Sequence, residues 1–135
     1  TQYYWGSAVG AEATLPTKTN TQFSPELISW DDTGMFFTVA TAGYYELMCR
    51  SSVQMASTDG ANVTFNLSSL ALGGGSTSLI QKANRISAAS DPEGVIIHWM
   101  GYLLGGTKVV CYISVGGGEG AVMFKGSTFT CKRIN

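Results

Sequence analysis

Charged side chains are scarce in this sequence. Asp, Glu, Lys and Arg make up 13% of the 135 residues, well below the roughly 25% of an average domain. Eight basic residues against nine acidic ones leave a net charge of −1, so the basic excess of a nucleic-acid-binding protein is missing. Hydrophobic residues are 44% of the chain, which excludes a disordered tail. The composition predicts one folded domain over residues 1–135, with part of its surface covered by a partner.

Residues that build metal and redox sites are also few. The sequence holds three cysteines, which are Cys49, Cys111 and Cys131. Their long spacings match no zinc or redox motif, so we interpret them as buried free thiols, with one disulfide and one free thiol as the alternative. The one histidine, His98, lies between Ile97 and Trp99, where we expect it in a core or an interface rather than in a catalytic triad. The sequence therefore predicts no enzyme, no catalytic residue, no metal site and no cofactor.

The remaining polar motifs indicate turns rather than chemistry. Asp31-Asp32 and Asp91-Pro92-Glu93 are the acidic clusters, and Asp favours turns because it hydrogen-bonds its own backbone. The glycine-rich runs Gly73–Gly75 and Gly116–Gly120 lack the Gly-Lys-Ser/Thr ending of a phosphate-binding loop. We therefore expect all four segments to join strands.

No long helical period appears in the chain. Instead, short runs alternate between apolar and polar residues and are bounded by Gly, Pro, Asp and Ser, which is typical of an all-β protein. About eight to ten such strands in one domain predict an antiparallel jelly-roll sandwich. Residues 76–93 show no clear period. The expected strands are Tyr3–Trp5, Leu27–Trp30, Met35–Ala40, Tyr44–Met55, Asn62–Ala71, Gly94–Leu104, Thr107–Val115 and Ser127–Ile134 with Phe124 before it.

The segment Val95–Leu104 differs from the other predicted strands because it is apolar on both faces. Val95, Ile97, Trp99 and Leu103 alternate with Ile96, Met100, Tyr102 and Leu104. The run is too short to span a membrane, and a strand that is apolar on both faces is buried on both. In a single sandwich only one face meets the core, so the other meets a partner, a covering loop or another copy of the chain. The low charge favours self-association.

Several motifs carry a family resemblance. Thr33–Phe36 followed by Gly43–Leu47 resembles the T-G-x-F…G-x-Y-x-F signature of complement C1q-type heads, which are jelly rolls related to tumour necrosis factor. Ser127–Phe129 is similar to the S-x-F of the closing strand, and Val95–Gly106 is similar to the segment before it. An aromatic first strand near Trp5 also fits, so the resemblance spans nearly the whole chain. Such heads also cap bacterial spore filaments and the vertex spikes of tailless, membrane-containing bacteriophages of the tectivirus type.

The resemblance implies a homotrimeric receptor-binding head at the tip of a viral spike or fibre, which would mediate host attachment through the avidity of several sites. We expect residues 1–135 to be the C-terminal fragment of a longer stalked protein on the virion surface, with a secreted protein as the alternative. The expected partners are copies of this chain and a host cell-surface receptor, without nucleic acid or membrane insertion. The alternative functions are a structural trimerisation or capsid-associated jelly roll without a receptor, and a small lectin.

Two sets of candidate residues follow from the resemblance. The doubly apolar strand is expected to face the three-fold axis of the trimer. The predicted trimer-interface residues are Tyr4, Trp5, Ile97, Trp99, Met100, Tyr102 and Phe129. Receptor-binding residues are expected on the long polar loops, because loops on a rigid scaffold commonly carry binding sites. These loops are predicted at Ala8–Asn20, Leu72–Glu93 and Gly116–Lys125. Their charged candidates are Lys82, Arg85, Asp91, Glu93 and Glu119.

Overall fold

The computed structural model describes residues 2–4, 28–31, 36–55, 61–86, 93–116 and 122–134. These residues form nine antiparallel strands and no helix, which confirms the all-β prediction. The strands are β1 (Gln2–Tyr4), β2 (Ile28–Asp31), β3 (Phe36–Val39), β4 (Gly43–Met55), β5 (Ala61–Leu70), β6 (Ser76–Ile86), β7 (Glu93–Leu103), β8 (Lys108–Gly116) and β9 (Val122–Arg133).

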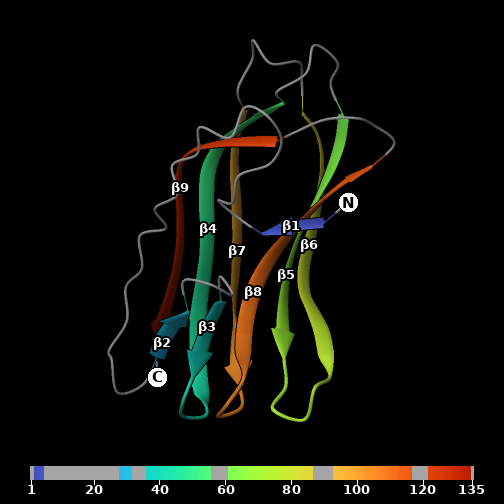
Figure 1. The fold of residues 1–135 in the computed structure, drawn as a ribbon. Coiled ribbons are helices and arrows are strands. Elements are labelled where there is room, and N and C mark those ends of the chain that lie inside the picture. The colour runs from blue at the N-terminus through green and yellow to red at the C-terminus, as the bar shows by residue number, and fades with distance from the viewer. Residues whose placement is uncertain are drawn as a thin grey trace.

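The strands are arranged in two sheets that pack face to face. The larger sheet has the order β2-β3-β8-β5-β6, and β1 pairs with β8 beyond the end of β3. The smaller sheet has the order β7-β4-β9, with β4 at its centre. Figure 1 shows β9, β4 and β7 side by side in one layer and β8, β5 and β6 in the other. From β4 to β9 the chain passes repeatedly between the two sheets, with the hairpin β5-β6 as the one pair of consecutive strands in the same sheet, as expected of a jelly roll.

The core lies between the sheets because the long strands alternate as their sequences predict. On β4, Tyr45, Leu47 and Cys49 are fully buried, whereas the residues between them are partly or fully exposed. Successive side chains of a strand point to opposite faces, so one apolar series is enough to fill the space between two sheets. On β5, Val63 and Phe65 are buried in the same way.

An aromatic cluster joins the two sheets at one side of the core. Phe129 of β9 lies with its ring centroid 4.9 Å from that of Phe37 on β3 and 5.9 Å from that of Trp30 on β2. Trp30 and Phe37 are in turn 4.7 Å apart. The two pairs made by Phe129 are edge to face and the third is tilted, and such pairs at these distances add to the gain from burial. Phe129 therefore links β9 to the larger sheet.

The predicted loop at Leu72–Glu93 is wrong, because strand β6 occupies Ser76–Ile86. The sequence shows no clear period there because β6 is the edge strand of its sheet, with Leu79 and Ile80 as its partly buried hydrophobic residues. The structure has a turn at residues 71–75, then the strand, while residues 87–92 lie outside the described residues. The predicted loop at Gly116–Lys125 is also shorter than expected, because Gly116 ends β8 and β9 starts at Val122. Residues 8–20 are not described.

The turn between β7 and β8 depends on a glycine. The Thr107 amide donates to the Leu104 carbonyl at 3.3 Å, and Gly106 has a φ of +84°. A positive φ at the third position is the mark of a type II turn, and glycine adopts it without strain. The Gly106 amide also donates to the Val39 carbonyl at 2.7 Å. This turn is therefore fixed to the end of β3.

Replacing Gly106 tests this account of the turn. Gly106→Ala is expected to lower the free energy of unfolding by about 1–2 kcal/mol, because an L side chain is strained at this φ. Gly73→Ala is the matched control, since a Cβ there would meet nothing within 4 Å, and should change stability by less than about 0.5 kcal/mol. Urea unfolding measures both. Equal losses of stability in the two variants would contradict the assigned role of Gly106 in the turn.

All three cysteines are free and buried, which confirms their interpretation as buried thiols. Burial raises the pKa of the Cys131 thiol to about 12. Burial also raises the pKa of Cys49, with a smaller contribution from the neighbouring Cys111 thiol on the opposite sheet. Thiols with raised pKa values are weak nucleophiles, because the thiolate is the reactive form. The cysteines therefore act as small core residues.

Candidate functional site

The smaller sheet has an exposed face with an unusual share of large apolar side chains. Among the strand residues whose side chains are described, four of this kind are exposed, and all lie on β4 and β7; they are Tyr44, Ile96, Met100 and Tyr102. No exposed large apolar residue is found among the described side chains in the strands of the larger sheet. We use the term outer face for the alternate residues from Tyr44 to Arg50 on β4, from Ile96 to Tyr102 on β7 and from Thr128 to Lys132 on β9. Grouped apolar exposure of this kind marks an interaction site.

Strand register makes the apolar side chains neighbours. Tyr44 is paired with Tyr102, and their rings meet edge to face with centroids 5.3 Å apart. Met100 is two residues from Tyr102 on the same face of β7, and Leu104 follows the strand with 66% of its surface exposed. The outer face is therefore most apolar toward the end where β4 begins and β7 ends.

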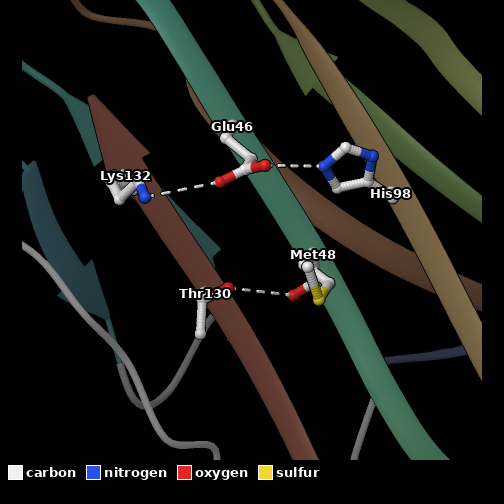
Figure 2. A network of polar contacts seen from close by, with 5 residues as sticks. All are labelled: Glu46, Met48, His98, Thr130 and Lys132. Carbon is white, nitrogen blue, oxygen red and sulfur yellow. Dashed lines mark hydrogen bonds and ion pairs between the residues drawn. The ribbon is translucent and has the colours of Figure 1, made fainter. Parts of the chain in front are cut away.

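The centre of the outer face is polar. Figure 2 shows Glu46 on β4 between His98 on β7 and Lys132 on β9. The Nε2 atom of His98 lies 2.8 Å from Oε2 of Glu46, and Nζ of Lys132 lies 3.7 Å from Oε1 of the same carboxylate. The threonine beside them, Thr130, approaches the Met48 carbonyl at 3.5 Å. One carboxylate thus joins the three strands of the sheet.

The contacts of Glu46 determine its charge state. The hydrogen bond with His98 is the largest influence and lowers the pKa of the Glu46 carboxyl; partial desolvation opposes this, and the Lys132 ammonium lowers the pKa further. Glu46 is therefore ionised at neutral pH and accepts hydrogen bonds only. It follows that His98 donates its Nε2 proton to Glu46, whether the ring is neutral or charged.

The predicted interface residues fall on both faces of the smaller sheet. Met100 and Tyr102 lie on the outer face, where a partner can reach them. Ile97 and Phe129 are 1% exposed and belong to the core of the single chain, so the structure removes them from the interface. Trp99 is partly buried against the same core, with its ring over Gly101.

The other two predicted interface residues are less fully described. Tyr4 lies in β1, which pairs with β8, and its side chain is not described. Trp5 lies outside the described residues. The contribution of both residues to an interface therefore remains a prediction.

The predicted receptor-binding residues lie mainly on strands. Lys82 and Arg85 are in β6 and Glu93 begins β7, so their predicted place in a loop is wrong. The exposed Lys82 side chain reaches across the open side of the sandwich, with Nζ 3.5 Å from the Ile96 carbonyl oxygen of β7. Arg85 and Glu93 are described in their backbone alone, and Asp91 and Glu119 lie outside the described residues. The structure thus gives a contact for Lys82 and leaves the five residues untested as a binding site.

The structure also places His98 differently from a core histidine. Its side chain is 41% exposed and stands on the outer face.

The described residues contain no group of three or more His, Cys, Asp or Glu that could hold a metal ion. In the same part of the chain, no helix has the length and apolar character needed to cross a membrane.

Comparison with known proteins places the fold. No family model matches the chain, and no curated protein matches it. Among solved structures, the chain is similar to the Eiger TNF of S. frugiperda, with a TM-score of 0.60 and 13% sequence identity over 80% of this chain and 69% of the other. The fold is therefore a TNF-like jelly roll, as the sequence predicted.

Proposed function

We propose that this chain is the recognition head of a homotrimer, which binds a receptor and has no catalytic activity. The observation that carries the proposal is the outer face of β7-β4-β9, whose exposed apolar side chains belong to a TNF-like jelly roll. TNF-like proteins are typically trimeric and bind receptors. The similar structure is that of a TNF.

A second copy of this chain is the partner that fits the outer face best. The face combines aromatic and methionine side chains with one carboxylate and two permanently charged cations, Arg50 and Lys132. Interface cores are enriched in Tyr and Met, and the same patch on each copy can meet its equivalents around a symmetry axis. Self-association would also explain why this chain has so few charges.

A trimeric head presents equivalent receptor sites side by side. Sites that are individually weak then bind with high avidity to a surface that carries many receptors. We therefore propose attachment to a host cell from the tip of a viral spike or fibre on the virion surface. Lys82, Arg85, Asp91, Glu93 and Glu119 remain the candidate receptor contacts.

Binding to host cells tests the receptor-binding function directly. Fluorescent head protein is incubated with host cells, and the bound signal is read by flow cytometry with excess unlabelled head as competitor. We expect saturable, competed binding that falls at least about tenfold for a variant held monomeric, since avidity is then lost. A trimer that shows no competed binding would contradict the receptor-binding function and favour a structural trimerisation domain. Competition by free sugars would instead favour the lectin.

A further inference from the structure

The outer face holds the one histidine of the chain at its polar centre. His98 donates to Glu46 across 2.8 Å, and Lys132 approaches the same carboxylate from β9. Histidine is the side chain that ordinarily changes charge between about pH 5 and 8. A histidine in the middle of an association face therefore makes the charge of that face depend on pH.

We propose that protonation of His98 weakens self-association through the outer face, so that the assembly loosens in acid. The inference rests on the proposed self-association and adds its regulation. It requires that a further positive charge on this face is unfavourable, which follows from the charges that surround His98.

Those charges are predominantly positive. On the outer face of β4 and β9, the described residues place one carboxylate, Glu46, against Arg50 and Lys132. On the other side of β7, the edge strand β6 brings the ammonium of Lys82 to 3.5 Å from the Ile96 carbonyl. Protonation of His98 therefore adds positive charge where positive charge is already in excess.

Protonation of His98 has two electrostatic effects, and one of them is the same in the free and the associated chain. A charged His98 attracts Glu46 more strongly, but this pair lies within one chain and is present before and after association. The effect that differs between the two states is the transfer of an additional charge out of water and toward the like charges of another copy. Both parts of that effect are unfavourable. Association is thus linked to the neutral form of His98, and the association constant falls as the pH drops.

Sedimentation velocity at about pH 7.5 and about pH 5.5 tests this inference. For the wild-type chain we expect the apparent dissociation constant to rise at least about tenfold at the lower pH. His98→Gln keeps an N–H donor for Glu46 but carries no charge at either pH, so its association should be independent of pH. His98→Lys carries a charge at both, so its association at the higher pH should be as weak as that of the wild type at the lower pH. Far-UV circular dichroism at both pH values verifies folding.

The outcomes separate this inference from the proposed function. A wild-type chain that assembles equally at both pH values overturns the inference and leaves the proposed trimer standing. Equal weakening of the wild type and His98→Gln also overturns it, because another group would then carry the proton. A chain that stays monomeric at the higher pH at every concentration overturns the proposed self-association itself.

Discussion

Met100→Asp is expected to abolish self-association without unfolding the chain. Met100 lies on the outer face with 54% of its surface exposed, so the substitution removes no core contact. In the assembly the substitution exchanges an apolar contact for a carboxylate that must lose its water, and burying a charge costs several kcal/mol. We expect the apparent dissociation constant to rise by at least about a hundredfold, which corresponds to about 3 kcal/mol.

A matched variant separates the effect of position from the effect of charge. Gln81→Asp adds the same charge to exposed β6, at the edge of the larger sheet, where it should leave association unchanged. Sedimentation velocity gives the association state of each variant, and circular dichroism shows whether it is folded. A folded Met100→Asp chain that associates as strongly as the wild type would show that the copies meet elsewhere.

Phe129→Ala is expected to lower the free energy of unfolding by about 3–5 kcal/mol. Phe129 is 1% exposed, and its ring contacts Phe37 and Trp30 across the two sheets. Truncation leaves a cavity at the point where β9 is joined to the larger sheet, and the neighbouring rings fill such a cavity only in part. This loss is a large share of the roughly 5–15 kcal/mol that stabilises a typical domain.

An exposed residue on β2 provides the control. The Ser29 side chain is exposed and lies outside the outer face, so Ser29→Ala should change the free energy of unfolding by less than about 0.5 kcal/mol. Urea unfolding is measured at one protein concentration for all variants, because association stabilises the folded chain by mass action. A loss below about 1 kcal/mol for Phe129→Ala would contradict the account of the core.

The strands with one apolar series could be predicted well from the sequence. On β4 the alternation that ends in buried Tyr45, Leu47 and Cys49 is visible in the order of residues alone. Strand β6 could not be predicted, because an edge strand touches the core through few residues and has no clear period. Polar residues such as Lys82 then look like part of a loop.

The candidate site could be predicted only in part. The apolar outer series of β7, with Met100 and Tyr102, is visible in the sequence as a strand with no polar face. Because both series are apolar, however, period alone does not say which one meets the other sheet, and Ile97 was therefore predicted at the interface. The contact of His98 with Glu46 could not be predicted. The two residues are 52 positions apart in the sequence, and their diagonal contact depends on the register between β7 and β4.

The molar mass of the wild-type chain in solution tests the central claim most directly. Size-exclusion chromatography with light scattering at neutral pH gives this mass without assumptions about shape. We predict a mass of three times the 14.3 kDa of one chain, since the outer face should be covered by other copies. A mass of 14.3 kDa at every concentration would contradict the account, because the apolar outer face of β7-β4-β9 would then stand open to water.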